Sequence, residues 1–296
     1  MNILLLTGGN SSERKISLLS AMQVKKALLE NGHQVKVYDL KNGYFPIRNL
    51  AKKYDVLFPV LHGEEGEGGK LHKYLSKLKK PVVGSKNYKG FQKAWYKIPF
   101  KKYCDKNNLP TPKWKIVKTS KDVISFGFPC VVKTSSGGSS REVYILKSKK
   151  ELSDKSKEIF SHKDLFVEDY IQGHEATAGV LNNKALAVIE IVPPDNSWFN
   201  YKNKYSGQTK EIVDSPNLSP KAKIKIQKMA LKIHRFFNLG SYSRTDFMID
   251  ENDKIYVLEI NTIPGLTSES LLPKETGIPF RKFIETLVKL SLDKSA

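Results

Sequence analysis

The sequence is poor in cysteine and contains no long apolar segment, and each scarcity excludes a class of protein. Only Cys104 and Cys130 occur in 296 residues, without the spacing of a metal site, so no disulfide framework is expected and a reducing cytoplasm fits best. No apolar run approaches the ~20 residues of a transmembrane helix, so no membrane partner is expected. The first residues, MNILLLTGGN, lack a basic segment and break at Gly8-Gly9, which favours a strand over a signal peptide.

Arginine is also scarce, although the chain is strongly basic. The net charge is +20, yet only six of the 50 basic residues are arginine, and lysine is spread along the whole chain. Specific reading of bases relies on arginine, and nucleic-acid binding usually concentrates charge on one face. We therefore expect no nucleic-acid partner, and interpret the charge as a lysine-rich composition that can steer anionic substrates. A basic nucleic-acid-binding protein stays open as an alternative and would show steep salt dependence.

Helical and strand patterns alternate at the start of the chain and then change. Strand patterns lie at 3–7, 34–40, 55–63 and 81–85, with helical patterns at 17–32 and 69–80. This alternation predicts βαβ units and a parallel sheet. There follow a helical pattern over 94–108, antiparallel strands up to Val192, a polar and aromatic loop over 193–211, and an amphipathic helix ended by Gly240. The expected fold combines α/β and α+β parts in two or three domains.

The stretch VLEINTIPGLTSES near the C-terminus begins as a buried strand but contains a carboxylate and a carboxamide. Because side chains alternate along a strand, Glu259 and Asn261 are expected on the same face as Val257. Leu258 and Ile260 are expected on the opposite face. A buried acid is costly unless something cationic lies against it, so the strand predicts a cation beside Glu259.

The segment before this strand supplies a second acid. SRTDFMID lies upstream, and DENDK at 250–254 has the composition of a hairpin turn. With that turn as the midpoint, Asp246 falls opposite Glu259, and such partners have Cβ atoms about 5 Å apart. Asp246, Glu259 and Asn261 then present oxygen ligands on one face, which suits Mg²⁺ with waters and substrate phosphates as further ligands. The alternative is a solvated hairpin face on which Asp246 pairs with a lysine.

A loop rich in glycine and serine could hold the phosphates that a magnesium site implies. In FPCVVKTSSGGSSREVYIL, Lys133 is followed by small residues that let backbone amides approach a triphosphate. The pattern is not GxxxxGK[ST] and no helix is expected after it, so it is not a P-loop. TGGNSSE near the N-terminus is likewise not GxGxxG, so a Rossmann dinucleotide site is not expected.

Seven stretches together resemble, in the same order, the D-alanine–D-alanine ligases of the ATP-grasp superfamily over nearly the full chain. They are GGNSSERKIS, LHGEEGEGG, VVKTSSGGSS, VEDYIQGHE, YKNKYS, GSYSRTDFM and LEINTIPGLTSES. The resemblance implies an ATP-grasp fold with an N-terminal parallel α/β substrate-binding domain (1–88), a central ATP-lid domain (89–173) and a C-terminal catalytic domain (174–296).

The resemblance also assigns residues to ATP and to metal. The matches to ATP-binding residues are Lys97 and Lys133 for the phosphates, Glu168 and Glu175 for adenine and ribose, and Lys204 on a lid loop. The matches to metal ligands are Asp246, Glu259 and Asn261, for two Mg²⁺ ions or for Mn²⁺ in their place.

A further set of matches concerns D-alanine. Glu13 matches the residue that holds the ammonium group of the first D-alanine, and Ser139 and Tyr205 would tie it to both mobile loops. The other matches are His62 beside the first D-alanine, Arg244 and the Gly265 backbone at the oxyanion site, and Ser270 with Leu271 around the second D-alanine. Taken singly, Glu13 could be an acid at a helix N-terminus, His62 a satisfied strand-end histidine and Tyr205 a surface residue.

Several positions depart from the family pattern. The departures are Tyr96 and Gly68 in place of Asp, Thr134 in place of Pro, Arg141-Glu142 in place of Val-Gly, and Asp169 where a lysine often contacts adenine. None of them removes a metal ligand or one of Glu13, Ser139 and Tyr205. They therefore bear on nucleotide affinity and loop closure more than on the type of reaction.

The expected activity is ATP-dependent ligation of two D-alanines to D-alanyl-D-alanine through an acyl phosphate, for peptidoglycan precursor synthesis. ATP and D-alanine are the expected partners, and the resemblance implies a cytoplasmic homodimer. The alternative is a related ATP-grasp ligase that uses another D-amino or hydroxy acid, which would differ around Glu13, Tyr205 and Ser270.

Replacing Tyr205 by phenylalanine tests whether this residue makes the enzyme prefer the amine of D-alanine over the hydroxyl of D-lactate as nucleophile. The hydroxyl is expected to anchor Ser139 and Glu13, and loss of one buried hydrogen bond costs about 1–3 kcal/mol when its partners are left unpaired. We expect Tyr205→Phe to raise the share of ester relative to dipeptide when D-alanine and D-lactate compete. The product ratio is measured across pH for both forms, and an unchanged ratio would place the selection elsewhere in the loop.

Overall fold

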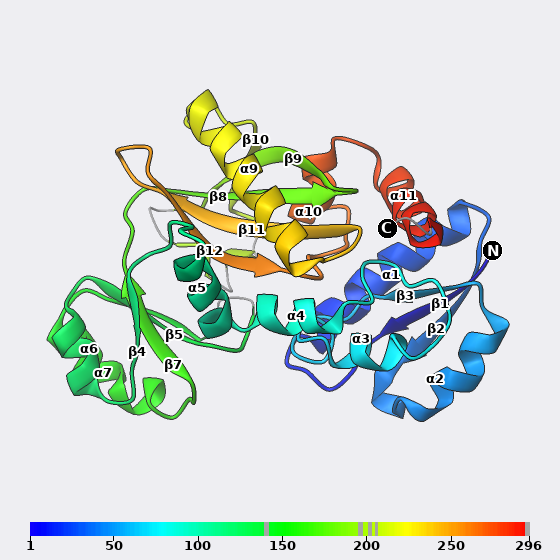
Figure 1. Cartoon of the computed structure of the whole chain (residues 1–296), viewed down its shortest axis with the longest axis horizontal. Helices are drawn as coiled ribbons and strands as arrows, with labels where there is room; N and C mark the ends of the chain where they lie inside the picture. The colour runs from blue at the N-terminus through cyan, green and yellow to red at the C-terminus, as the bar shows by residue number, and fades with distance from the viewer. Residues whose placement is uncertain (139–141, 195–197, 201–202, 205–206, 294–296) are drawn as a thin grey trace.

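The computed structural model describes residues 1–138, 142–194, 198–200, 203–204 and 207–293, which form three β-sheets with helices packed around them (Figure 1). The parallel sheet, in blue, lies at one end of the view, and the green four-stranded sheet lies at the other. The five-stranded sheet lies between them and above. One parallel α/β part and two antiparallel parts confirm the predicted fold class.

The N-terminal sheet has the order β2-β1-β3, and both of its strand pairs are parallel. Its strands are β1 (Asn2–Thr7), β2 (Gln34–Asp39) and β3 (Val56–Pro59). Along β1, Ile3 and Leu5 pack into one hydrophobic cluster, and Leu4 and Leu6 pack into another. The uninterrupted apolar run of β1 is therefore explained by burial on both faces, as parallel sheets require.

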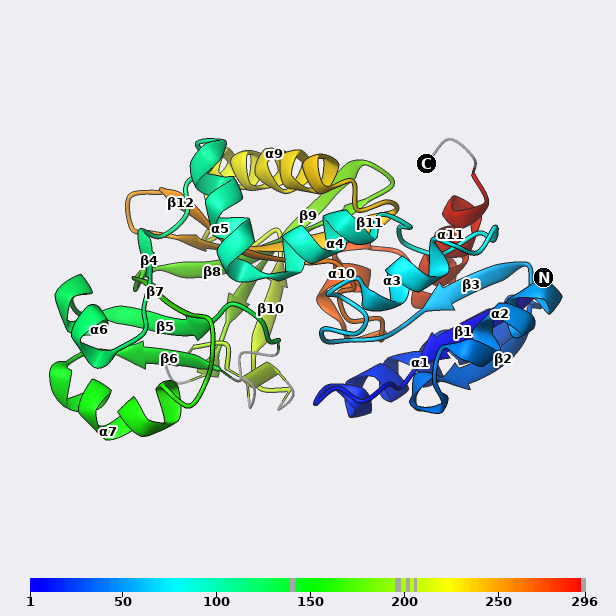
Figure 2. The ribbon, with the colours of Figure 1, turned by 60° about the horizontal axis from the view of Figure 1, so that its bottom comes forward.

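Helices from both ends of the chain cover this sheet. The first helix, α1 (Arg14–Glu30), and the last, α11 (Phe280–Leu292), contact each other and share one hydrophobic cluster with β1 and β3. Figure 1 shows the two helices next to each other, and Figure 2 shows the same end of the molecule turned by 60°. The elements on the other face are the helices α2 (Phe45–Leu50) and α3 (Lys70–Leu75) and the 3₁₀ turns η1 (Leu40–Asn42) and η2 (Ala51–Lys53).

The predicted fourth strand at 81–85 is present only as a single bridge beside β3. Val82 forms a parallel bridge with Leu57, which donates from its N to Pro81 O and accepts from Val83 N at its O, both at 2.9 Å. The pairing stops there, since Ser241 N donates to Gly84 O at 3.1 Å and Gly84 N donates to Ser241 Oγ at 3.2 Å. The segment thus extends the sheet by one bridge and then ties the N-terminal part to the start of β11.

The four-stranded sheet is antiparallel, with the order β4-β7-β5-β6. Its strands are β4 (Trp114–Ile116), β5 (Cys130–Thr134), β6 (Val143–Leu146) and β7 (Leu165–Asp169). Its helices are α6 (Ser120–Phe126) and α7 (Lys149–Ile159), which share one hydrophobic cluster with the strands. Thr119 and Ser148 cap these helices, because each side chain accepts a bond from a backbone amide of the first turn.

The five-stranded sheet has the order β10-β9-β8-β11-β12. Its strands are β8 (His174–Leu181), β9 (Lys184–Val192), β10 (Lys210–Val213), β11 (Tyr242–Ile249) and β12 (Ile255–Asn261). The helices that share its main hydrophobic cluster are α4 (Tyr88–Trp95), α5 (Lys97–Lys106) and α9 (Pro220–Phe237). A short helix, α10 (Leu271–Thr276), contacts β8, β9 and β10.

Two predicted helix boundaries are wrong. The helix expected over 94–108 is two helices, since Tyr96 between α4 and α5 is extended, with φ −75° and ψ 117°. Pro99 is tolerated because it lies in the first turn of α5, where backbone amides have no partner within the helix. The helix expected to end at Gly240 ends at Phe237, because Asn238 adopts the left-handed conformation with φ 48°.

Each sheet lies within one of the three predicted domain ranges, but the helices cross between them. α4 and α5 pack on the five-stranded sheet, and α11 packs beside α1. The boundaries at 88 and 173 therefore stay a prediction. Over the part of the chain that the structure describes, no helix has the length and apolar character needed to cross a membrane.

Gly90 tests the packing of α4 against the end of α9. A Cβ atom at this position would come within 1.9 Å of Phe237 O. Helix propensity alone would make Gly90→Ala stabilising by about 1 kcal/mol, but the clash forces α4 away from α9. We expect a net destabilisation of about 1–3 kcal/mol in urea unfolding. Lys93→Ala, on an exposed position of the same helix, is the control and should change stability by less than about 0.5 kcal/mol.

Candidate active site

A cavity of about 1020 Å³ lies between the four-stranded and the five-stranded sheets. Strands of both sheets and the loop after β5 line it. The sequence-predicted site residues among its lining are Lys97, Lys133, Glu168, Glu175, Lys204, Asp246 and Glu259. Seven charged side chains from distant parts of the chain thus meet in one place.

The alternation of strand side chains explains how β5 and β7 contribute to the cavity. Cys130, Val132 and Val167 pack into the hydrophobic cluster under α6 and α7. Their neighbours Lys133 and Glu168 point the other way and line the cavity. One face of this sheet therefore forms the core, and the other carries the charges.

Glu168 is held between two lysines. Its two carboxylate oxygens pair separately with Lys133 Nζ and Lys101 Nζ. Burial alone would raise the pKa of Glu168, but the two lysine charges hold it below its usual range. Lys101, which is 1% exposed, was missed in the sequence, although its place four residues after Lys97 on α5 puts both lysines on one helix face.

Lys97 joins strand β12 to the glycine-rich loop. It begins α5, and its Nζ lies 3.2 Å from Glu259 Oε2 and donates to Gly137 O at 2.8 Å. Its backbone amide donates to Ser135 O at 2.7 Å. The lysine thus fixes both partners at one corner of the cavity.

The hairpin of β11 and β12 confirms one prediction and corrects another. Asp246 pairs directly with Glu259, as expected. The register then shifts, so that Phe247 pairs with Val257 and Leu258 is an extra, bulged residue. Because of this bulge, Val257 lies in the hydrophobic core, whereas Leu258 and Glu259 both line the cavity. The predicted placement of Val257 on the face of Glu259 is therefore wrong.

Asp246 is surrounded by hydrogen-bond donors. Arg244 Nε and Nη2 donate to its two oxygens, each at 3.0 Å. Thr177 Oγ1 donates at 2.7 Å and Asn261 Nδ2 at 2.9 Å. The partner of Asp246 is thus an arginine and not the lysine of the alternative considered above.

Two other acids of the cavity, Glu259 and Glu175, differ in their tendency to be charged. Burial alone would raise the pKa of Glu259, but Lys97, Lys204 and Lys133 lower it to about 2. Glu175 is less well compensated, since burial raises its pKa to about 7 against the charge of Lys204. The cavity therefore has a strongly charged acid at its lysine-rich end and a titratable one on β8.

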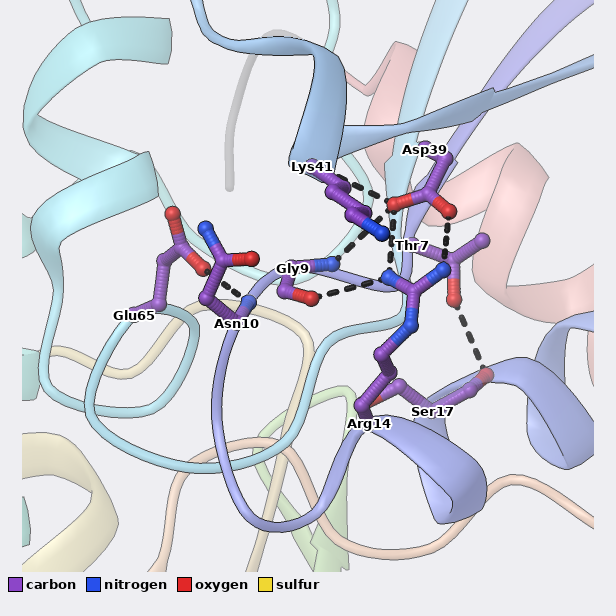
Figure 3. A network of polar contacts seen from close by, with 8 residues as sticks. All are labelled: Thr7, Gly9, Asn10, Arg14, Ser17, Asp39, Lys41 and Glu65. Atoms are coloured by element: carbon purple, nitrogen blue, oxygen red, sulfur yellow. Dashed lines mark hydrogen bonds and ion pairs between the residues drawn. The ribbon is translucent and has the colours of Figure 1, made fainter.

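An ion pair holds in place the loop that carries Glu13. Figure 3 shows this pair, which joins Arg14 to Asp39. Arg14, the next residue, donates from Nη1 to Asp39 Oδ1 and to Gly9 O, both at 2.8 Å. Glu65 Oε2 accepts from Asn10 N at 3.3 Å on the other side of the loop. The loop between β1 and α1 is thus fixed to β2 and to the segment after β3.

The carboxylate of Glu13 meets the glycine-rich loop. A Cβ atom built on Gly138 would lie 2.8 Å from Glu13 Oε2, so the acid lies directly over this glycine, which lines the cavity. His62 is buried beside it, and burial lowers the pKa of His62 against the opposing charge of Glu13. Ser20 Oγ lies 3.4 Å from His62 Nε2. The structure therefore brings Glu13 and His62 together next to the cavity.

A second acid near Glu13 was not singled out in the sequence. Glu67 is 6% exposed, and its Oε2 accepts from Gly63 N at 2.8 Å. Burial, followed by the charge of Glu13, raises the pKa of Glu67 to about 8. Its place in LHGEEGEGG was the available signal, but three acids in this stretch could not be ranked without their burial.

The residues predicted for the oxyanion and the second D-alanine form a neighbouring group. Burial alone would lower the pKa of Arg244, but Asp246 holds it above its usual range. A Cβ atom on Gly265 would lie 2.6 Å from Ser270 Oγ, so these two residues touch. Ser270 precedes α10, and Leu271 is its first residue. Leu271 shares a hydrophobic cluster with Ile189 and Ile191 of β9, and Ile191 lines the cavity.

Two predicted residues, Ser139 and Tyr205, lie outside the described residues, as does Arg141 among the departures from the family pattern. Of the other departures, Tyr96 donates from its hydroxyl to Glu64 Oε1 at 2.8 Å, and Asp169 lines the cavity. The described part of the site thus offers cations for a phosphate chain at one end. It offers an acid for an ammonium group at the other.

A family model and full-length sequence relatives point to the same family. Residues 98–289 match the family model described as the D-ala D-ala ligase C-terminus. The D-alanine–D-alanine ligase of Maridesulfovibrio salexigens is 35% identical over 302 residues, covering 99% of both chains. That of Aquifex aeolicus is 35% identical over 297 residues, covering 97% of this chain and 100% of its own.

The solved structures agree with the sequence relatives. The crystal structure of the D-alanine–D-alanine ligase from Bacillus anthracis complexed with ATP matches with a TM-score of 0.84 and 30% identity, covering 99% of this chain and 97% of that chain. The family model spans more than half of the chain, and the relatives match it from end to end. The chain belongs to the D-alanine–D-alanine ligase family of ATP-dependent ligases.

Proposed function

We propose that the cavity binds ATP and that the loop at Glu13 holds the first of the two D-alanines that the enzyme joins. The observation that carries this proposal is the meeting of opposite charges beside that loop. The cavity residues concerned are Lys97, Lys133, Lys204, Asp246 and Glu259. Gly138 lines the cavity and lies under the Glu13 carboxylate, so the two subsites are continuous.

The nucleotide would lie across the cavity with its base near the connection between β7 and β8. Residues 169–173 line that end. The phosphates would lie near Lys97 and Gly137, which are already bonded to each other. Lys133 would exchange Glu168 for a phosphate oxygen, while Lys101 continues to compensate Glu168. This exchange avoids leaving a buried acid without a partner.

Asp246, Glu259 and Asn261 fit the oxygen-ligand chemistry of Mg²⁺. The two carboxylates are cross-strand partners and line the cavity beside Lys97. Within the described ranges, no three residues of the types His, Cys, Asp and Glu are grouped for a metal, so Asn261, water and phosphate oxygens would complete the shell. When bound, the two ions would neutralise charge that develops on the phosphates.

The reaction has two steps in this proposal. The carboxylate of the first D-alanine, held through its ammonium group at Glu13, attacks the γ-phosphorus of ATP and releases ADP. The resulting acyl phosphate is attacked by the amine of the second D-alanine, near Ser270 and Leu271, and phosphate leaves as the amine loses a proton. Arg244 and the Gly265 amide would stabilise the oxyanion formed at the carbonyl.

The homodimer and the cytoplasmic location also stay proposals. The exposed face of α1 supports an interface, since Leu19, Met22 and Leu29 are 48%, 69% and 50% exposed and lie on one side of the helix. Cys104 and Cys130 are both free and buried, which suits a reducing compartment.

Phosphate release with a panel of D- and L-amino acids and D-hydroxy acids tests the substrate assignment. We expect turnover with D-alanine alone, and dipeptide as the product. Release that requires another acid would support a related ligase instead and would reassign the subsites at Glu13 and Ser270.

Glu259→Gln tests the metal assignment. The lost charge is needed for Mg²⁺, whereas Gln keeps the volume, so we expect ligase activity to be abolished with the fold nearly intact. Phosphate release is measured over a range of Mg²⁺ concentrations, and circular dichroism checks the fold. Glu251→Gln, on the exposed turn of the same hairpin, should retain full activity. Near wild-type turnover of Glu259→Gln at saturating Mg²⁺ would contradict the assignment.

Glu175→Gln tests the electrostatics of the cavity in the absence of ATP and metal. The carboxyl group has its usual pKa of 4.5 when unfolded and about 7 when folded. Between these values the native state binds more protons, so stability falls as pH rises, by up to about 3 kcal/mol. We expect the variant to gain stability over wild type progressively across this window, and then to hold a constant advantage. Parallel pH profiles in urea unfolding would show that Glu175 does not titrate there.

A further inference from the structure

Glu275 is a buried acid that the reaction described above does not use. It lies in α10 and is 3% exposed. Neither of its carboxyl oxygens has a side-chain hydrogen-bond partner in the described part of the chain, and the backbone amide of Gly179 is a donor close enough to lower its pKa. A buried acid with so little compensation is costly to stability, so its presence calls for a functional reason.

Gly179 fixes where this acid lies. A Cβ atom on Gly179 would be only 2.1 Å from Glu275 Oε2, so the carboxyl group occupies the space of the missing side chain. Gly179 on β8 pairs directly with Arg244 on β11. Direct cross-strand partners project to the same face of a sheet, with Cβ atoms about 5 Å apart. The Glu275 carboxyl group is therefore beside the Arg244 side chain.

The electrostatics agree with this placement. Burial raises the pKa of Glu275 well above its usual range, and the charge of Arg244 is the main effect that opposes the rise. In turn, Glu275 contributes to holding the pKa of Arg244 above its usual range, after Asp246. Arg244 is thus the cation that this acid is placed to meet.

A metal ion at Asp246 would compete with Arg244 and the other donors that this carboxylate binds. Its two oxygens already accept four hydrogen bonds, two from Arg244 and one each from Thr177 and Asn261. A carboxylate offers about four lone-pair sites, so a cation at Asp246 displaces some of these donors. Arg244 contributes two of the four, and its guanidinium then needs another anion to keep its orientation.

We propose that Glu275 is a positioning residue that anchors Arg244 when Asp246 is engaged in the loaded site. This inference rests on the proposed function, in which Asp246 binds Mg²⁺ and Arg244 faces the oxyanion. The carboxyl group over Gly179 would hold the guanidinium when Asp246 is bound to the metal. Glu275 itself does not touch substrate, and its effect passes through Arg244.

Two substitutions separate this role from a structural one. Glu275→Leu removes the buried acid at similar volume, and Glu275→Gln keeps the shape but cannot become an anion beside Arg244. If Glu275 serves function at a cost to stability, Glu275→Leu should raise the Tm of the chain without metal or nucleotide by about 2–4 °C. The same variant should lower kcat about tenfold or more, with KM for ATP changed less than about twofold. Glu275→Gln should lower kcat to a similar extent without the gain in Tm.

Glu285→Gln is the matched control on α11. Its carboxylate bonds to His33 at 2.8 Å, far from the cavity in the fold, so the variant should lower Tm and leave kcat unchanged. Action through Arg244 is tested in an Arg244→Lys background, where Glu275→Leu should lower kcat much less than in the wild type.

Each other outcome overturns the proposal. Unchanged kcat in both Glu275 variants means that the acid does not position Arg244. A fall of Tm and kcat together in Glu275→Leu marks a structural residue, and full additivity with Arg244→Lys excludes action through the arginine. Failure of the wild-type chain to join D-alanines would instead reject the proposed function, so the two failures are distinguishable.

Discussion

Buried acids in the cavity are compensated by cations placed directly against them, and the site depends on this matching. Glu168 forms ion pairs with Lys101 and Lys133. Glu259 pairs with Lys97, and Asp246 pairs with Arg244. Burying an unpaired charge is costly, so each cation lowers the cost of placing its acid in the cavity. Two of these cations, Lys97 and Lys133, are those that we propose pass to the phosphates. The interactions that stabilise the empty cavity are thus those that a nucleotide would exchange.

The four-stranded and the five-stranded sheets, formed by different parts of the chain, bring these charges together. β5 and β7 supply Lys133 and Glu168 from the face that does not carry α6 and α7. β11 and β12 supply Asp246 and Glu259, and the bulge at Leu258 turns Glu259 into the cavity while Val257 stays in the core. The bulge lets a strand that packs tightly on one side present an acid at the point where regular alternation would bury it.

Much of the fold could be predicted from local patterns. The parallel first sheet, the hairpin at 250–254 and the pairing of Asp246 with Glu259 follow from alternation and turn composition, and the structure confirms them. The predictions that failed depended on distant partners. The segment 81–85 extends the first sheet by only one bridge because Gly84 bonds to Ser241. The face of Val257 is set by a bulge that no turn signal marks.

The sequence by itself determined the residue types, their order and the family, because seven motifs and one strand register are local properties of the chain. Only the tertiary structure decided which cation faces which acid. Lys101, Glu67 and Glu275 were not found from the sequence, although all three are buried and charged or titratable. Desolvation and the distances between charges depend on the packing of elements far apart in the chain. Glu275 shows the reason most directly, since it gains its place beside Arg244 only when α10 packs over Gly179.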